Sequence, residues 1–190
     1  AVNEDGTVAI FHKDNPDKPV SKWWKRIYAL ELLIHRTEYY MAKDQNGKEA
    51  IFHISNPEKS ISQWWNHIVT LSGILKGTSE YYIAKNSNNK YAIFHKDNPH
   101  HPISMWLNAI SVNGLVSGQS EYYVGTDEQM QEAIFHKDNP DKPISGWWYR
   151  IDADQCLTGQ SAYYIVANKE RKVAIFHTNN THKPISDWWS

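Results

Sequence analysis

Cysteine is almost missing from this chain of 190 residues, because Cys156 is the only one. A single thiol excludes both an intramolecular disulfide and a metal site built from several thiolates. Other copies of the repeat described below carry Ile74 and Leu115 at the same place, so Cys156 is predicted to be a buried, small apolar residue. The lack of disulfides does not assign a compartment. A secreted or cell-surface location is slightly favoured over a cytoplasmic one.

A surplus of charge is lacking as well. The chain has 20 Lys and Arg against 21 Asp and Glu, which gives a net charge of -1. Binding to nucleic acid or to anionic lipid depends on an excess of cations on one face, so neither partner is predicted. No apolar run approaches the roughly 18 residues of a membrane helix, and no signal peptide is recognised. The sequence therefore predicts no membrane insertion.

Catalytic and cofactor motifs are absent. The chain has no Gly-x-Ser-x-Gly, no glycine-rich phosphate loop, no His-Glu-x-x-His and no paired cysteine motif. Its recurring acids, such as Asp14 and Glu38, recur because the repeat recurs, whereas an enzyme needs one asymmetric group of residues. We therefore predict a non-enzymatic protein without a cofactor.

A repeat is what the sequence does have. The pattern Ala-Ile-Phe-His followed by a proline-bounded loop and a Trp pair is written five times, with edits. The Phe of successive copies stands at Phe11, Phe52, Phe94, Phe135 and Phe176, so the steps are 41, 42, 41 and 41 residues. A fixed period of this length is the signature of a repeat architecture. We call these copies one to five.

A β-hairpin joins successive copies. The runs Tyr39-Tyr40-Met41-Ala42-Lys43 and Lys48-Glu49-Ala50-Ile51-Phe52-His53 flank Asn46-Gly47. Asn and Gly accept the positive φ of a tight turn, which makes this pattern a strong hairpin signal. Because neighbouring side chains of a strand point to opposite faces, one Tyr of each pair is expected to face away from the core.

A helix is predicted after each proline-bounded loop. Ile103, Trp106, Leu107 and Ile110 follow the i, i+3, i+4, i+7 spacing of an amphipathic helix, and copy four repeats the spacing. Asn15 before Pro16 resembles an N-cap and first-turn pair, and the Ser within the first turn is a second candidate cap. Gly114 is expected at the left-handed C-terminal cap.

These patterns together predict an α+β fold. It consists of tandem repeats of about 41 residues, each with a hairpin strand pair and one short amphipathic helix, as an open solenoid or a closed ring. An all-β propeller is the alternative. We expect one repeat domain over residues 1–190, with units of approximately 1–41, 42–83, 84–124, 125–166 and a partial unit 167–190.

The five recurring histidines are predicted to be structural. One His stands in each copy, at His12, His53, His95, His136 and His177. One imidazole per repeat supplies too few ligands for a shared metal ion, so no metal is predicted. Hydrogen bonds from each ring to the following loop or to a Tyr hydroxyl are the favoured interpretation, and a role in pH sensing or ligand contact is the alternative.

Aromatic residues are unusually frequent, with nine Trp and eleven Tyr. The second Trp of each pair is replaced by Leu107 in copy three, which is typical of a core position. The first Trp is never replaced, and it either packs in the core or forms a binding platform. The paired Tyr residues leave the same two interpretations open, namely cross-strand packing or a ligand surface.

The functional prediction is a multivalent binding module for a glycan or a protein surface, with a carbohydrate-binding, lectin-like site as the favoured type. Sugar rings stack on aromatic faces, Asp and Asn bind hydroxyls, and repetition adds avidity. A structural or protein-interaction array with internal aromatics is the alternative. The oligomeric state is not predicted. The predicted ligand-binding residues come from copies one, three and four: Asp14, Asn15, Trp23, Asp97, Asn98, Trp106, Asp138, Asn139 and Trp147. Copies one and four keep the full pattern and are expected to bind best.

Overall fold

The computed structural model describes residues 1–69 and 73–190. Its contacts divide the chain into two compact units. Unit 1 comprises Ala1–Asn88 and Phe94–Pro102, and unit 2 comprises Asn89–Ile93 and Ile103–Ser190. Each unit is described by itself below. The prediction of one repeat domain over the whole chain stays a prediction.

Short strands dominate both units, and each repeat contributes at most one short helix. In chain order the elements are β1 (Phe11–His12), β2 (Asn15–Pro19), β3 (Arg26–Tyr28), α1 (Leu30–Leu33), β4 (Tyr39–Lys43), β5 (Glu49–His53), β6 (His67–Ile68), α2 (Gly73–Lys76), β7 (Tyr81–Lys85), β8 (Tyr91–His95), β9 (Ala109–Ser111), α3 (Asn113–Ser117), β10 (Tyr122–Thr126), β11 (Glu132–His136), β12 (Arg150–Asp152), α4 (Asp154–Leu157), β13 (Tyr163–Ala167) and β14 (Val173–His177).

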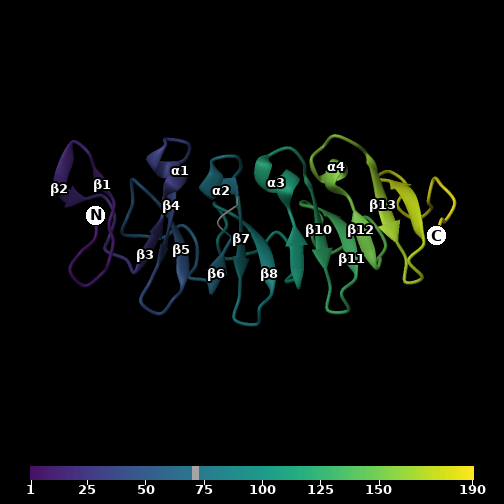
Figure 1. Cartoon of the computed structure of the whole chain (residues 1–190), viewed down its shortest axis with the longest axis horizontal. Coiled ribbons are helices and arrows are strands. Elements are labelled where there is room, and N and C mark those ends of the chain that lie inside the picture. The colour runs from purple at the N-terminus through teal and green to yellow at the C-terminus, as the bar shows by residue number, and fades with distance from the viewer. Residues whose placement is uncertain (70–72) are drawn as a thin grey trace. The chain divides into compact units, whose positions relative to one another are not determined.

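The strands form five small antiparallel sheets. Strand β1 pairs with β2, and the other four sheets have the orders β3-β4-β5, β6-β7-β8, β11-β10-β9 and β12-β13-β14. Among the described residues these sheets do not close into a barrel. In each unit the short helices lie at one end of the strands and the hairpin turns at the other (Figure 1). We call these the helix end and the turn end.

The predicted hairpins are confirmed. Strand β4 pairs with β5 in the register Tyr40↔Phe52 and Lys43↔Glu49, and β10 with β11 and β13 with β14 pair in the same way. The turn needs one residue with positive φ, which Gly47 supplies at 80°. Asn89, Met130 and Arg171 adopt φ values of 59–62° at the corresponding turns. The turn sequence therefore varies without changing the hairpin.

The predicted helix at the Trp stripe is wrong. In copy three the residues from Ile103 to Leu107 form an irregular, extended segment that continues into β9. Its backbone bonds to β8 instead of to itself: Ile103 donates to the Ile93 carbonyl at 2.8 Å, and Leu107 exchanges two hydrogen bonds with Tyr91 at 2.8 and 2.9 Å. Ile and Trp favour extended conformations, and an isolated helix of about two turns is marginal, so pairing with the strand prevails.

A recurring serine fixes this extended segment to the preceding strand. Copy four illustrates the pattern, because Ser145 Oγ accepts the backbone N–H of Ile134 at 2.9 Å and donates to the Gly146 carbonyl at 2.8 Å. All five copies make both bonds, through Ser21, Ser62, Ser104, Ser145 and Ser186. These serines are therefore not helix caps, because their hydroxyls satisfy the backbone of another segment.

The helices that do exist lie further along each repeat, in the connection before the Tyr pair. They have four or five residues, and a residue with positive φ follows each of them within two positions, such as Gly118 at 74°. Gly114, the expected C-cap, lies inside α3 instead. A Cβ at Gly114 would come within 1.2 Å of the Leu157 carbonyl oxygen, so this glycine permits the close approach of α4.

Buried side chains lie between the sheets and the segments that cross them. In copy two, Tyr40 stacks on Phe52 with 5.5 Å between ring centroids, and Trp24 packs on the same Phe at 5.2 Å. Tyr82 with Phe94 and Tyr123 with Phe135 repeat the stack. Cys156 is 3% exposed, which confirms its predicted burial.

Two further expectations concern insertion into a membrane and the propeller alternative for the fold. Within the described part of the chain, no helix has the length and apolarity required to cross a bilayer. The described sheets have two or three strands, whereas a propeller blade has four, which disfavours the propeller alternative. The choice between an open solenoid and a closed ring stays a prediction.

Candidate aromatic binding hollow

The first Trp of each pair is more exposed than the core aromatics beside it. Trp23 is 40% exposed and Trp64 is 37% exposed, while Phe52 is 2% exposed. Each of these two Trp rings contacts the Phe of its own copy edge-to-face, with 5.9 Å between centroids. Trp106, Trp147 and Trp188 are half-buried. The first Trp therefore packs on core rings and keeps part of its surface open to solvent.

A hollow of about 300 Å³ lies beside Trp147 in unit 2. Its lining combines three aromatic residues with polar residues of two hairpin turns: Gln131, Trp147, Trp148, Tyr149, Asn168, Lys169 and Glu170. Pockets of this size lie at the lower end of those that bind small ligands. Aromatic faces beside amide and carboxylate groups are the combination that binds a sugar ring and its hydroxyls.

The rigidity of this hollow comes from the strands that carry it. Trp148 exchanges two backbone hydrogen bonds with Glu132 at 2.8 and 2.9 Å, which fixes the Trp pair to the first residue of β11. The Trp147 ring contacts Phe135 at 5.7 Å. On the other side, Asn168 Oδ1 accepts the backbone N–H groups of Glu170 and Lys172, each at 3.0 Å, and so orders the turn.

Copies two and three fill the corresponding place with an asparagine bridge. In copy three, Asn108 donates to the Asp127 carbonyl at 2.8 Å and accepts from the Lys90 ammonium at 2.5 Å. In copy two, Asn66 donates to the Asn86 carbonyl and accepts from Lys48. Copy four has Tyr149 in place of the asparagine and Gln131 in place of the lysine, and there the hollow is open.

The predicted Asp and Asn residues lie elsewhere. Neither Asp138 nor Asn139 lines the hollow beside Trp147. Asp138 instead contacts Lys137 at 2.8 Å and His136 at 3.7 Å, and the Asn139 backbone donates to the His136 carbonyl at 3.0 Å. Asp97 and Asn98 have the same contacts in copy three. None of these four loop residues is among the residues that line the hollow, and their role in binding stays a prediction.

In copy one the loop residues and the Trp each have contacts of their own. Asp14 and Asn15 are exposed, and Asp14 lies 3.7 Å from His12. Asn15 begins β2 and pairs with His12, while Trp23 contacts Phe11. The N-cap role expected for Asn15 is wrong, because a strand begins here instead of a helix.

A charged cluster surrounds the recurring His in copies three and four. In copy four, His136 Nε2 lies 3.2 Å from Glu121, and its Nδ1 accepts the Asp138 backbone N–H at 3.2 Å. Lys137 bridges both carboxylates, at 3.2 Å from Glu121 and 2.8 Å from Asp138. The Tyr122 ring contacts the same His edge-to-face at 5.1 Å. The expected bond from His to the following loop is confirmed.

Lysine dominates the electrostatics of this cluster. Hydrogen bonds from Lys137, and secondarily from His136, lower the pKa of Glu121. Lys137 lowers the pKa of Asp138 in the same way. In copy three, Asp97 and then Glu80 raise the pKa of Lys96 to about 12. The carboxylates are therefore ionised and already neutralised by a cation.

The sequence did not reveal that His95 and His136 each have two carboxylates close by. Each His was expected to lack ligand partners, yet ligand atoms of Glu80, His95 and Asp97 lie within 4.8 Å of one another, as do those of the copy-four cluster. Lys96 sits between the two carboxylates, at 3.2 and 2.9 Å. The Nδ1 atom of His95 accepts a backbone N–H at 3.2 Å. The cluster is thus an ion-pair network whose cation is a lysine.

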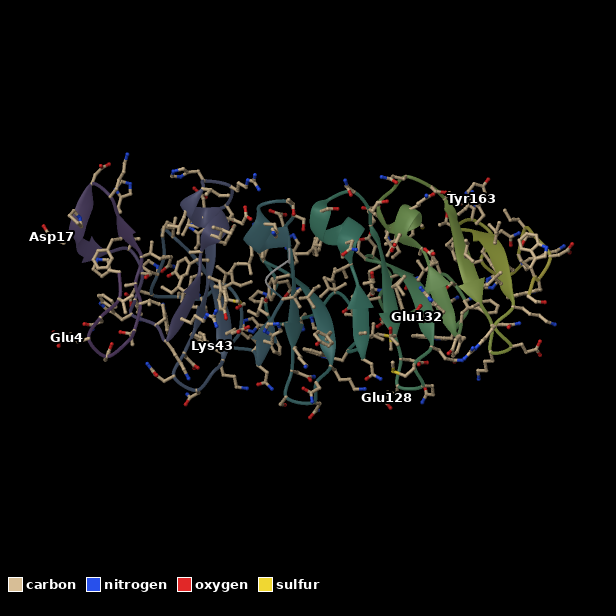
Figure 2. All side chains as sticks on the ribbon, viewed as in Figure 1. Glu4, Asp17, Lys43, Glu128, Glu132 and Tyr163 are labelled. Carbon is tan, nitrogen blue, oxygen red and sulfur yellow. The ribbon has the colours of Figure 1, made fainter. Side chains whose placement is uncertain are left out.

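The hollow and the histidine clusters lie at opposite ends of the same hairpins. Figure 2 shows Glu128 at the turn end of unit 2 and Tyr163, whose ring contacts His177, at the helix end. The hollow is lined by turn residues. Sequence reasoning found Trp147 but missed Gln131, Tyr149 and Asn168. For Gln131 and Tyr149 the signal was a difference between copies, since the Lys and Asn of copies two and three are both replaced in copy four. Asn168 carried no such signal, because Asn86 stands at the same place in copy two.

Comparison with known proteins adds no assignment to this geometry. Neither the models of known protein families nor the curated proteins contain a match to the chain.

Proposed function

We propose that this protein is a non-enzymatic carbohydrate-binding module and that the hollow beside Trp147 is its principal sugar site. The observation that carries the proposal is the lining of the hollow, where Trp147 and Tyr149 stand beside the amides of Gln131 and Asn168. Aromatic faces stack on the apolar face of a sugar ring, and amides bind its hydroxyls.

The charge balance supports an uncharged ligand. The net charge of -1 provides no general attraction for a polyanion. Around the hollow, Lys169 and Glu170 offer charges of opposite sign. A neutral saccharide needs no counter-charge, and its hydroxyls can donate to the Glu170 carboxylate or accept from the Lys169 ammonium.

The repeat offers several candidate sugar sites, and we expect them to differ in affinity. The exposed Trp23 and Trp64 are further aromatic platforms, and weak sites on one chain raise the overall avidity. Copy one has Lys25 where copies two and three have the bridging asparagine. Copies one and four are therefore proposed as the stronger sites, and copies two and three as weaker ones.

The test begins with a glycan array for the parent protein, followed by calorimetric titration with the best ligand. The variant Gln131→Lys/Tyr149→Asn installs in copy four the pair that bridges the turn in copies two and three, and so fills the hollow with a pattern the fold already accepts. We expect at least a tenfold loss of affinity, about 1.4 kcal/mol or more, with an unchanged melting temperature.

The matched control is Asp14→Ala/Asp138→Ala, which removes two of the exposed loop carboxylates without touching the hollow. Sugar binding that survives this change and is lost in the hollow variant assigns the site to the hollow. The opposite result moves the site to the Asp-Asn-Pro loops. Failure of the parent to bind any glycan of a broad panel leaves the alternative, a protein-interaction array, which the internal Tyr-Phe stacks favour.

A further inference from the structure

Copy two differs from its neighbours at the two positions that follow the recurring His. Copies one, three and four have a Lys and an Asp there, whereas copy two has Ile54 and Ser55. The polar cluster of copy two therefore consists of Glu38, His53 and Ser55. A carboxylate, an imidazole and a hydroxyl in contact in this order are the groups of a serine nucleophile with its base.

Hydrogen bonds join the three side chains in a line. Ser55 Oγ lies 2.7 Å from His53 Nδ1, and Glu38 Oε2 lies 3.0 Å from Nε2 of the same ring. The backbone N–H of Ser55 also donates to Nδ1, at 3.2 Å. Since a backbone N–H can only donate, Nδ1 is the unprotonated nitrogen, and Nε2 carries the proton that is donated to Glu38. Nδ1 is therefore placed to accept the hydroxyl proton of Ser55.

The β4-β5 hairpin holds these groups in place. Glu38 precedes β4 and His53 ends β5, and the backbone N–H of Ile54 donates to the Glu38 carbonyl at 2.9 Å. The Tyr39 ring contacts the imidazole edge-to-face, with 4.9 Å between ring centroids. Ser55 is exposed, and the His53 side chain is 25% exposed. The hydroxyl is thus accessible from solution while its base is fixed.

The charge that acts on the imidazole also differs between copies. In copy three, Lys96 contacts Glu80 at 3.2 Å and lowers the pKa of this carboxyl more than His95 does. Copy two has Ile54 in place of the lysine, and this side chain packs against the core. Glu38 therefore acts on its imidazole without a competing cation at this position, and its negative charge stabilises the imidazolium that forms when the ring takes a proton.

We propose that Ser55 is a nucleophilic acyl-acceptor site for activated esters and thioesters, a reactivity separate from the proposed sugar binding. Ser55 Oγ forms a bond to the acyl carbon, the bond from that carbon to the leaving alcohol or thiol breaks, and the hydroxyl proton passes to His53 Nδ1. The leaving group departs as an anion, and the imidazolium then releases its proton to water.

The neighbouring backbone limits this reaction to a single event. The N–H groups of Ser55 and Asn56 are both bonded to His53, at 3.2 Å to Nδ1 and at 3.0 Å to the carbonyl. They do not form the oxyanion hole that rapid turnover requires. We therefore expect one acyl group per chain without continuing hydrolysis, so the protein stays non-enzymatic.

The test incubates the full chain with para-nitrophenyl acetate and follows the release of nitrophenolate together with the intact mass of the protein. We expect release of one equivalent, a mass increase of one acetyl group, and an acetylated Ser55 in the peptide map. His53→Ala should slow acylation roughly a hundredfold, because a positioned base contributes about that much or more. Ser87→Ala, which changes an exposed turn serine outside the cluster, should leave the rate unchanged.

A double variant of copy four transfers the cluster to a second hairpin. Lys137→Ile/Asp138→Ser gives this copy, which already has Glu121 and His136, the residues of copy two. The proposal requires a second acetyl group on this variant, in the peptide that contains His136.

The matched control is the same change in copy five. Thr178→Ile/Asn179→Ser places a hydroxyl after His177, but Ala162 stands where copies two to four have Glu. We expect no acetyl group beyond the one at Ser55. No acetylation of Ser55 in the parent, an unchanged rate in the His53 variant, or equal labelling of the two double variants overturns the proposal. None of these results bears on sugar binding at Trp147, which has its own variant.

Discussion

Two adjacent residues of β11 differ in their burial. Phe135 is fully buried, and its ring stacks on Tyr123 with 5.3 Å between centroids and 8° between planes. His136, the next residue, lies at the surface beside Glu121 and Asp138. Both residue types recur in every copy. Recurrence within a chain therefore does not separate packing in the core from exposure at the surface.

The same contrast recurs at the helix end of the β7-β8 hairpin. One row of side chains, such as Tyr82 and Phe94, lies in the core, and the other row borders solvent at Tyr81 and His95 but is buried further along, at Ile93. Burial of apolar surface is the dominant favourable contribution to folding, while exposed ion pairs contribute little. The buried row should hold the fold, and the exposed features are free to serve recognition.

The largest expected effect is at the buried row. Phe135→Ala should lower the free energy of unfolding by about 3–5 kcal/mol, because a large side chain leaves a cavity in a packed core. His136→Ala, one residue further, should cost less than about 1 kcal/mol, since it removes a partly exposed ion pair. Urea denaturation of the two variants measures both values. Equal losses would contradict the division between the rows.

An intermediate effect is expected at alkaline pH. Burial raises the pKa of Tyr40 and of Tyr164 to about 12, against about 10 in an unfolded chain. Above pH ~10 the unfolded chain loses protons that the folded protein keeps, so folding stability should fall as pH rises from about 10 to about 12. The loss is on the order of 2 kcal/mol per tyrosine at the top of this window.

Thermal melting across this range, with tyrosinate absorbance recorded in parallel, checks the second prediction. Tyr40→Phe, which removes one of the titrating hydroxyls, should flatten the decline. A variant whose stability falls as steeply as that of the parent would show that buried tyrosines do not cause it.

The smallest effect is expected at the exposed cluster. Lys137→Met removes the cation that holds the pKa of Glu121 and Asp138 below their ordinary values. A carboxyl whose pKa is lower in the folded protein than in the unfolded chain stabilises the fold at pH values above its unfolded pKa. This contribution is lost as pH falls through the folded pKa. The variant should therefore titrate both carboxyls at higher pH in an NMR experiment, with almost no change in melting temperature at neutral pH. A large drop in melting temperature would instead make the cluster structural.

Much of the β architecture could be predicted from the sequence, because its signals are local. Asn46-Gly47 between two alternating runs specifies the β4-β5 hairpin, and each Tyr pair predicts one inward and one outward ring. The helix at Ile103–Ile110 was mispredicted because four apolar residues satisfied a helical spacing while a distant contact decided the conformation. Ser104 bonds to Ile93, 11 residues away, and no periodicity reveals such a bond.

The candidate site was predictable only in part. Trp147 stands out because the first Trp is never replaced. Gln131 and Asn168 lie in two different turns, 37 residues apart in the chain, and meet only because the Trp pair of copy four is bonded to β11 at Glu132. The short helices carried no signal, since four residues are too few to show a period.

The most direct test of the account is to record the indole N–H resonances of all nine tryptophans by NMR during titration with the best saccharide ligand. The account predicts large, saturable shifts at Trp147 and Trp148, which line the hollow, and smaller shifts at Trp23. It predicts none at Trp65, which packs on the buried Phe94 away from the hollow. Shifts at Trp65 with none at Trp147, or no indole shift with any saccharide, would contradict it.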